Sequence, residues 1–296
     1  MSMRSRRLLP VVGVGALVLL NVVLVVLLVT RPGASDVDAR DTPAVREETS
    51  PPSKRETQEL GVQADGALVR GGRLLVNVDA TTAWRADVGS CGSPGTLEHS
   101  ADGGRTWQEL PVDLAPVSRV RALGPESLVV IGGGAGCEPT YLSSATSGTS
   151  WTTNDQYLDG SWYLAPDDPD SVATPVGSVG TPCEAVQLAA RDAAGAAVLC
   201  ADATVALTAD GGASWSELTP NVRARAIGVA DEGYVVAGVW GPCADALAVS
   251  RLTSDGSAAG VPACTAVPVG EADEIAVSAG GGWTWVWSGD EVAVAQ

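Results

Sequence analysis

The chain of 296 residues has a single histidine, His99, and its six cysteines include no C-x-x-C pair. Structural zinc sites need four cysteine or histidine ligands at short, characteristic spacings. The sequence therefore argues against a zinc site, and no metal or other cofactor is expected. A catalytic histidine would need a nucleophile within reach, but Ser100 follows His99 directly and points to the opposite face of a strand.

Basic residues are also scarce. Lysine occurs once, at Lys54, and phenylalanine not at all. With 18 Lys and Arg against 35 Asp and Glu, the formal net charge is −17. So acidic a chain repels nucleic acid, which is not expected as a partner. The alanine- and valine-rich, lysine-poor composition is typical of GC-rich bacteria, so we expect an actinobacterial source.

One long apolar run, residues 8–30, stands near the N-terminus. A helix of about 20 apolar residues crosses a bilayer, whereas the apolar region of a cleaved signal peptide has only about 7–15. Arg4, Arg6 and Arg7 precede the run, so residues 1–7 are expected to stay in the cytoplasm. We predict a transmembrane signal-anchor helix at residues 8–30; the alternative is a signal peptide that is cleaved late.

Residues 31–60 are rich in Pro, Ser, Glu and charges of both signs, and contain almost nothing apolar. This composition predicts a disordered extracytoplasmic linker. Residues 61–296 then form the exported globular part, outside the membrane in either of the two interpretations of the N-terminus.

An eight-residue motif organises this globular part. It reads SADGGRTW from Ser100 to Trp107 and TADGGASW from Thr208 to Trp215, with a degraded copy, SATSGTSW, from Ser144 to Trp151. Asp followed by Gly between extended segments signals a tight hairpin, and Trp begins the returning strand. The motif residues are Ser100, Asp102, Gly104, Thr106, Trp107, Ser144, Gly148, Ser150, Trp151, Thr208, Asp210, Gly212, Ser214 and Trp215.

The pattern [ST]-x-D-x-G-x-[ST]-W resembles the Asp-box (BNR) repeat of β-propellers, which occurs in sialidases, sortilin-like proteins and the photosystem II assembly factor family. The resemblance is limited to the repeats, and the copy at Ser144 has Thr146 in place of Asp. It implies a β-propeller in which each box joins the two outer strands of a blade, away from any catalytic face.

Short Val- and Ala-rich runs separated by Gly and Asp turns predict an all-β domain. Four units of four strands can be assigned, and a fifth unit of three strands ends the chain. Ala67–Arg70 is expected to supply the missing strand and close the ring. We prefer five blades; residues 155–182 are either a long loop or the strands of a sixth blade.

Cysteines of an exported domain are expected to form disulfides. Cys183 and Cys200 flank one predicted turn, and Cys243 and Cys264 flank another, so each pair would face across strands. Cys91 and Cys137 remain, and their pairing would join neighbouring blades. The expected bridges are Cys91–Cys137, Cys183–Cys200 and Cys243–Cys264.

Two clusters are candidate binding sites. Trp283, Trp285 and Trp287 alternate, so they face one side of a strand. They form either an aromatic platform for a ligand or the packing between the last and first blades. Asp167, Asp168 and Asp170 form either a Ca²⁺ site or, as we prefer, a solvated turn.

The resemblance also raises sialidase activity, which would require an arginine triad, a Tyr–Glu pair and an Asp acid/base. The Arg-Ile-Pro signature of that family is absent, and we name no catalytic residue. We expect a non-catalytic module that binds or scaffolds a protein or glycan, with a sialidase-like glycoside hydrolase and an assembly factor for a membrane complex as alternatives.

Overall fold

The computed structural model describes residues 72–166, 168, 170–271 and 274–296. The predicted transmembrane segment at 8–30, the linker at 31–60 and the closing strand at Ala67–Arg70 lie outside these residues. The described helices are three short 3₁₀ turns, η1 (Ala135–Cys137), η2 (Asp155–Tyr157) and η3 (Gly241–Cys243). None of the helices in the described part could span a bilayer.

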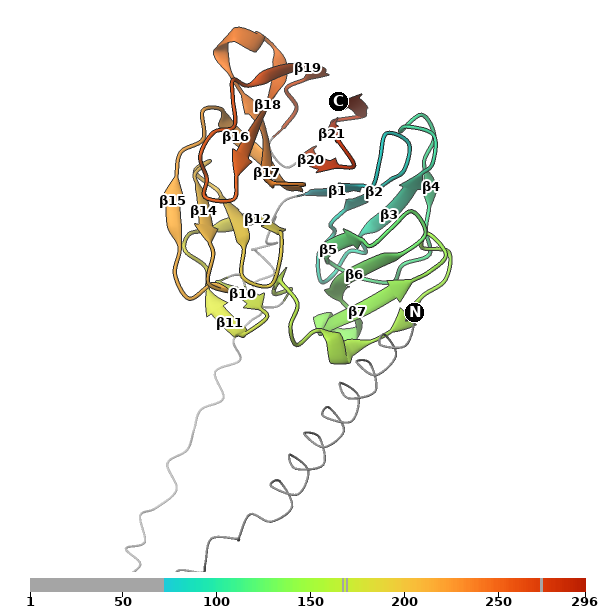
Figure 1. The fold of residues 1–296 in the computed structure, drawn as a ribbon. Helices are drawn as coiled ribbons and strands as arrows, with labels where there is room; N and C mark the ends of the chain where they lie inside the picture. The colour runs from blue at the N-terminus through green and yellow to red at the C-terminus, as the bar shows by residue number, and fades with distance from the viewer. Residues whose placement is uncertain (1–71, 167, 169, 272–273) are drawn as a thin grey trace, which may run out of the picture. The chain divides into compact units, whose positions relative to one another are not determined.

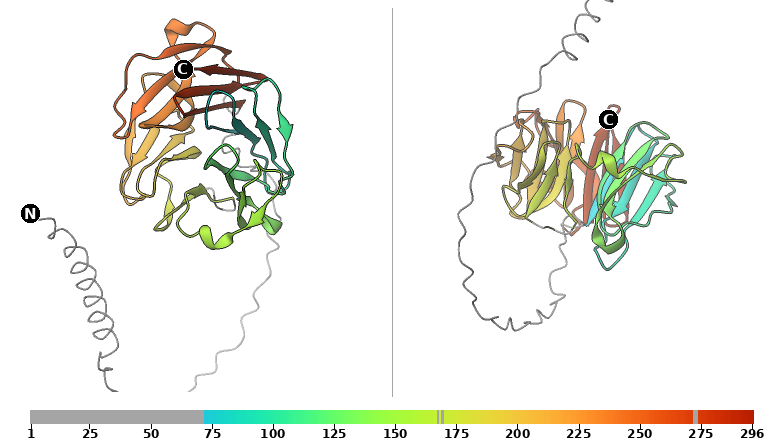
Figure 2. Two further views of the ribbon diagram at one scale, coloured as in Figure 1. Left: turned by 45° about the vertical axis from the view of Figure 1, so that its right-hand side comes forward. Right: turned by 90° about the horizontal axis from the view of Figure 1, so that it is seen from below.

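Six antiparallel sheets follow one another along the chain and surround a common centre (Figures 1 and 2). The first sheet consists of β1 (Arg73–Asn77), β2 (Ala83–Asp87), β3 (Thr96–Ser100) and β4 (Gln108–Glu109). The second consists of β5 (Val117–Ala122), β6 (Leu128–Gly133), β7 (Pro139–Ser144) and β8 (Thr152–Thr153). The third is β9 (Tyr163–Leu164), β10 (Ser171–Thr174) and β11 (Gly177–Gly180).

The fourth sheet is β12 (Ala185–Ala190), β13 (Ala196–Cys200), β14 (Val205–Thr208) and β15 (Ser216–Leu218). The fifth is β16 (Arg223–Ala230), β17 (Gly233–Val239), β18 (Ala246–Thr253) and β19 (Ala263–Pro268), and the sixth is β20 (Ile275–Gly280), β21 (Trp283–Ser288) and β22 (Glu291–Ala295). We number these sheets blades 1 to 6. The protein is a six-bladed β-propeller with blades of three or four strands.

The preferred count of five blades was wrong, because residues 155–182 contain the strands of blade 3. This blade is irregular. The indole nitrogen of Trp162, just before β9, donates 2.9 Å to the carbonyl of Asp192, just after β12. This bond places the Trp162 side chain beside the end of β12. Because β9 has only two residues, the alternation along the sequence was too weak to reveal a blade.

The first Asp box is a closed hydrogen-bonded turn. The Ser100 hydroxyl donates to Asp102 Oδ1 (2.9 Å) and accepts from the Gly104 amide (2.9 Å). Asp102 in turn accepts from the Thr106 amide (3.0 Å) and hydroxyl (2.7 Å). Gly104 has φ +79°, a conformation that glycine adopts without strain. The motif residues therefore satisfy one another within the turn.

The second intact box repeats this network. The Thr208 hydroxyl donates to Asp210 Oδ1 (2.8 Å), and Asp210 accepts from the Ser214 amide (2.9 Å) and hydroxyl (2.6 Å). In the degraded copy, the hydroxyl of Thr146 accepts from the Ser150 amide at 3.1 Å and so takes the place of one carboxylate oxygen. The loss of Asp thus removes charge from the turn but keeps its geometry.

Each of these three boxes packs against a tryptophan of the preceding blade. Trp285 and Trp107 meet edge to face, with ring centroids 6.3 Å apart, and Trp162 and Trp215 pack in the same way at 6.3 Å. The indole nitrogen of Trp84 donates 3.1 Å to the carbonyl of Ser147 inside the degraded box. Large aromatic rings therefore fill the spaces between blades 6 and 1, 1 and 2, and 3 and 4.

Side chains close the ring where blade 6 meets blade 1. The Asn77 side-chain amide donates to the Gly280 carbonyl (3.0 Å), and the Asn77 backbone amide donates to the Ser278 hydroxyl (3.1 Å). Arg73 adds bonds to the carbonyls of Glu274 (2.9 Å) and Gly289 (2.6 Å). These bonds join the first and last blades without a shared strand among the described residues.

Three disulfides join the cysteines in the predicted pairs, Cys91–Cys137, Cys183–Cys200 and Cys243–Cys264. The first links blade 1 to blade 2, and each of the other two lies within the region of one blade. All six cysteines are therefore in disulfide bonds.

The Asp boxes predict a specific acid sensitivity. Hydrogen bonds, first from the side chains of Thr106 and Ser214, lower the pKa of Asp102 and of Asp210 from 3.8 to about 2. A lowered pKa in the folded state stabilises the fold above the unfolded pKa, and this stabilisation is lost as the pH falls from about 4 to about 2. We expect the Asp102→Asn, Asp210→Asn variant to have a lower unfolding temperature at pH 7 and a shallower decline over that pH range.

Thermal unfolding followed by circular dichroism at successive pH values measures this effect. Glu217→Gln, at an exposed position on β15, is the matched control and should keep the wild-type pH profile. Equal slopes for the double variant and the wild type would contradict the assignment of the acid sensitivity to the boxes.

Candidate functional site

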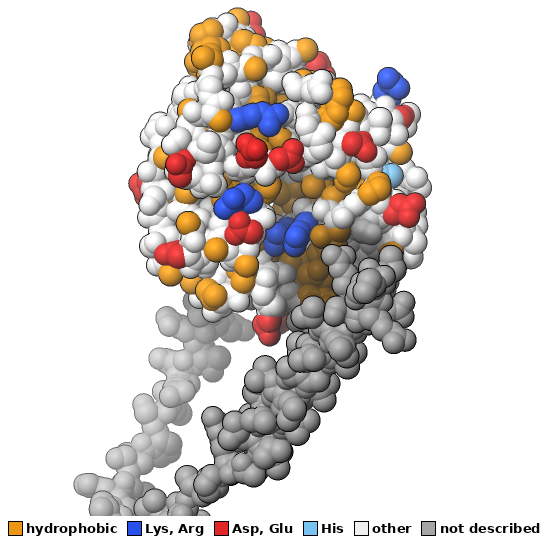
Figure 3. Space-filling view, in the orientation of Figure 1, with side chains coloured by type: hydrophobic (Ala, Val, Ile, Leu, Met, Phe, Trp, Pro, Cys, Tyr) orange, Lys and Arg blue, Asp and Glu red, His pale blue; other side chains and the backbone are white. Residues whose placement is uncertain are grey.

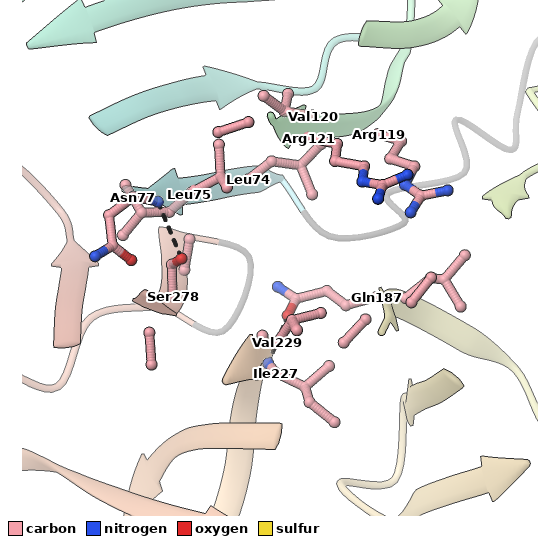
Figure 4. A pocket seen from close by; sticks show the side chains of 18 of the residues that line it. Leu74, Leu75, Asn77, Arg119, Val120, Arg121, Gln187, Ile227, Val229 and Ser278 are labelled. Carbon is pink, nitrogen blue, oxygen red and sulfur yellow. Dashed lines mark hydrogen bonds between the residues drawn. The ribbon is translucent and has the colours of Figure 1, made fainter. Parts of the chain in front are cut away.

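A cavity of about 230 Å³ lies at the centre of the propeller. Its walls come from the inner strands β1, β5, β12, β16 and β20. Consecutive residues of β1, β5 and β12 contribute to the lining (Figure 4). In Figure 3 the drawn face of the domain is hollowed near its middle, with basic side chains beside the hollow and acidic ones scattered around it.

Gln187 joins three blades inside this cavity. Its side-chain oxygen accepts from the Ile227 amide (2.9 Å) on β16, and its side-chain nitrogen donates to the Ile275 carbonyl (3.3 Å) on β20. The side chain is only 5% exposed. It therefore satisfies backbone groups of inner strands, which have no neighbouring strand on the channel side.

Four arginines line the cavity: Arg73, Arg119, Arg121 and Arg191. Two of them are neutralised by carboxylates. Arg73 pairs with Asp87 (3.1 Å) and lies 4.0 Å from the Trp287 ring centre, and Arg191 pairs with Asp192 (3.0 Å). These two have structural partners on their own blades or across the closure of the ring.

Arg119 and Arg121 differ from the other two. Both lie on β5, two residues apart, and their guanidinium groups overlap in the view of Figure 4. Arg119 donates 2.7 Å to the carbonyl of Trp162. Burial and the charge of Arg121 lower the pKa of Arg119 to about 10, so it stays protonated at neutral pH. In the part of the chain that the structure describes, neither guanidinium has a carboxylate partner.

The described lining of the cavity contains no Asp, Glu, His or Tyr. The described lining thus lacks the Tyr–Glu pair and the acid/base Asp of a sialidase-like site, and the carboxylates beside its arginines, Asp87 and Asp192, are engaged in ion pairs. Tyr234 is 1% exposed within the core, and Tyr141 and Tyr157 pack on each other with ring centroids 5.6 Å apart.

Two of the three tryptophans of the predicted platform are buried, and only Trp283 is half-buried, so the three do not form an exposed aromatic surface. Trp285 and Trp287 are 0% and 3% exposed. Trp285 donates 2.9 Å to the Asp79 carbonyl, and Trp287 lies beneath the guanidinium groups of Arg73 and Arg85. Trp285 and Trp287 pack blade 6 against blade 1, which is the alternative that the sequence left open.

His99 and the acidic cluster form no reactive site. The His99 ring stacks on Trp84 (centroids 4.9 Å apart), and burial lowers the pKa of His99. Asp168 caps a turn by accepting from the Asp170 amide at 3.0 Å, whereas Asp167 lies outside the described residues. Across the described ranges, no group of three or more ligand residues could hold a metal.

A fourth turn of the Asp-box type escaped the sequence comparison. Asp255 accepts from the Ser257 amide (3.0 Å), and the Thr253 hydroxyl also donates to Asp255. The signal was the string TSDGS at residues 253–257, which lacks the tryptophan. Leu207 and Leu218 of blade 4 lie against Gly256 of this turn, so leucine replaces the aromatic contact.

A second cavity, of about 310 Å³, separates blade 5 from blade 6. Small apolar residues of β19 and β22 line it, among them Ala263, Ala293 and Ala295. Its one charged side chain in the described lining, Arg251, donates 2.8 Å to the Thr284 hydroxyl. It is larger than the channel cavity, and among its polar side chains Arg251, Thr284 and Thr265 are already hydrogen-bonded within the protein.

No protein-family model matches the sequence, and no curated protein matches it. Similar solved structures include YCF48 bound to D1 peptide, with 19% identity over 77% of this chain and 64% of that chain and a TM-score of 0.29. Aleuria aurantia lectin has 11% identity over 78% of this chain and 96% of that chain, with a TM-score of 0.42. Trypanosoma rangeli sialidase has 14% identity over 76% of this chain and 52% of that chain, with a TM-score of 0.37. The chain spans less than two thirds of the YCF48 and sialidase chains, and similarity at this level concerns the fold alone.

The bridging role of Gln187 can be tested by Gln187→Leu. This change leaves the buried Ile227 amide and Ile275 carbonyl without their partner, and an unsatisfied buried group costs about 1–3 kcal/mol. We therefore expect the free energy of unfolding, measured by denaturant titration, to fall by about that amount. Gln108→Leu on the exposed strand β4 is the control, and an equal loss in both variants would contradict the bridging role.

Proposed function

We propose that this chain is a membrane-anchored, extracytoplasmic binding module, and that its propeller channel receives a group of a protein or glycan partner. The observation that carries the proposal is the channel cavity with its two unneutralised arginines. Ligand sites combine apolar walls with a few polar groups that orient the ligand, and the channel cavity has this composition.

A non-catalytic role fits the chemistry of the cavity. Hydrolysis of a glycoside requires a pair of groups that act as acid and as nucleophile or base. The described cavity residues supply guanidinium, amide and hydroxyl groups, of which the amide of Gln187 and the hydroxyl of Ser278 already bond to other blades. These groups suit recognition better than bond cleavage. Assembly of a membrane complex would be one form of such protein recognition.

The three disulfides support export, because disulfides persist in oxidising compartments outside the cytoplasm. Together with the apolar run at residues 8–30, they favour a propeller held outside the membrane by an N-terminal anchor. The linker at 31–60 would give the domain reach from the bilayer surface.

Blocking the channel should abolish ligand binding. Leu75, on β1, lines the cavity, and Leu75→Trp would fill part of it. We expect the full-length protein to bind a subset of glycans or peptides on arrays, and this variant to lose at least tenfold in affinity. Leu123→Trp, at a position 58% exposed, is the matched control.

Binding that survives Leu75→Trp would move the site out of the channel. Fluorogenic sialosides and other aryl glycosides serve as substrates in a parallel assay, in which we expect no product above the blank. Turnover by the wild-type protein that disappears in the blocked variant would replace the binding role by hydrolysis.

Membrane anchoring is tested by deleting residues 8–30 in the source bacterium. We expect the deletion to move the protein from the membrane fraction to the soluble fraction, because the apolar run is lost. Deletion of residues 31–60 is the control and should leave the protein in the membrane. Protease added outside the cytoplasmic membrane should digest the propeller of the wild-type protein, and full protection would contradict the orientation.

A further inference from the structure

We infer that Arg119 and Arg121 form a subsite for a single oxyanion, a carboxylate or phosphate group carried by the channel ligand. This inference rests on the proposed function and names the chemistry of the group that the channel receives. It concerns one anionic group on an otherwise uncharged or weakly charged carrier, and not a polyanion.

The first argument is that two positive charges are held together without compensation. Arg119 and Arg121 point to the same side of β5 because they are two residues apart. Two like charges on the same side of one strand repel each other, and burial together with the charge of Arg121 lowers the pKa of Arg119. An anion between them would remove this repulsion and gain charge-assisted hydrogen bonds.

The second argument concerns free donors. A guanidinium group has five N–H donors. One nitrogen of Arg119 is bonded to the carbonyl of Trp162, and this bond fixes the side chain in place. Arg121 is exposed, and the structure gives it no hydrogen bond within the described residues. The pair therefore combines a positioned guanidinium with one that is available to a ligand.

The third argument is the setting of the pair. Val120, Leu75 and Val229 line the same cavity, and apolar walls strengthen an ion pair by lowering the local dielectric constant. The cavity volume of about 230 Å³ is below the roughly 300–1,000 Å³ of sites for drug-sized ligands. The subsite therefore fits a single group of a larger partner that remains outside the channel.

The fourth argument is selectivity. The chain has a net charge of −17, so its surface repels polyanions at long range. Screening limits this repulsion to about 10 Å at moderate salt, and a single anionic group can pass it more easily than a chain of charges. The acidic exterior and the basic pair together favour isolated carboxylates and phosphates.

The test is isothermal titration of the full-length protein in detergent micelles with inorganic phosphate and, separately, with acetate. We expect at least one of the two to bind, and Arg121→Gln to weaken that binding at least tenfold. Arg121→Lys should retain part of the phosphate affinity, because it keeps the charge but loses the planar fork of donors. Preference for acetate indicates a carboxylate ligand, and preference for phosphate indicates a phosphate ester.

Arg105→Gln, at an exposed turn of blade 1, is the matched control and should bind as the wild type does. Arg119 is left unchanged because its bond to Trp162 joins blades 2 and 3. Equal unfolding temperatures of the three variants and the wild type show that the propeller is intact. Absence of binding by both anions, or binding that Arg121→Gln does not weaken, overturns the subsite.

Binding of heparin, a polyanion, tests whether the subsite is restricted to single anionic groups. We expect heparin to bind no more tightly than phosphate, and tighter binding that depends on Arg121 would overturn the restriction to single anions.

Different results would contradict the subsite and the proposed function. A ligand that Leu75→Trp abolishes but Arg121→Gln leaves unchanged keeps the channel function and removes the subsite. If phosphate binding depends on Arg121 but Leu75→Trp does not weaken the binding of the array ligands, the subsite is kept and the channel function is removed.

Discussion

The structure depends on the contact between an Asp-box turn and a tryptophan from the preceding blade. The turn closes through its own side chains, so it presents a rigid surface with glycine at the point of closest approach. At Gly104, a methyl group would lie 3.1 Å from the Trp285 ring. Backbone closure within one blade thus creates the space that the aromatic ring of its neighbour fills, and repetition of this contact gives the blades their mutual orientation.

The contact is absent between blades 2 and 3 and between blades 5 and 6, and at the second of these junctions the packing is incomplete. Small residues such as Ala263 and Ala293 meet there, and a cavity of about 310 Å³ remains. Between blades 4 and 5, leucines occupy the place of the tryptophan. The ring nevertheless closes, because Asn77, Arg73 and Gln187 bond inner strands of different blades. Polar side chains at the centre therefore complement aromatic packing nearer the rim.

This division of roles explains why the channel is the place to look for binding. Most of its polar side chains hold inner strands together and cannot be released without loss of stability. Arg121 makes no hydrogen bond within the described residues, and Arg119 makes one, to the Trp162 carbonyl. A strongly acidic protein that keeps two adjacent arginines uncompensated in a partly enclosed cavity bears an electrostatic cost, and a bound anion would offset it.

The sequence by itself determined the local features of this protein: the box turns, most of the strands and the three disulfide pairs. The turns, the strands and two of the disulfides depend on residues near one another along the chain or on the symmetry of a hairpin around its turn. The pair Cys91–Cys137 followed because only these two cysteines remained. The tertiary structure alone decided the number of blades, the burial of Trp285 and Trp287, and which of the four channel arginines are neutralised. The strand β9 of blade 3 has only two residues, which are too few for a pattern. The burial of the tryptophans depends on neighbours from other blades, whose approach is fixed only when the ring closes. The ion pair of Arg73 with Asp87 forms only when β1 pairs with β2.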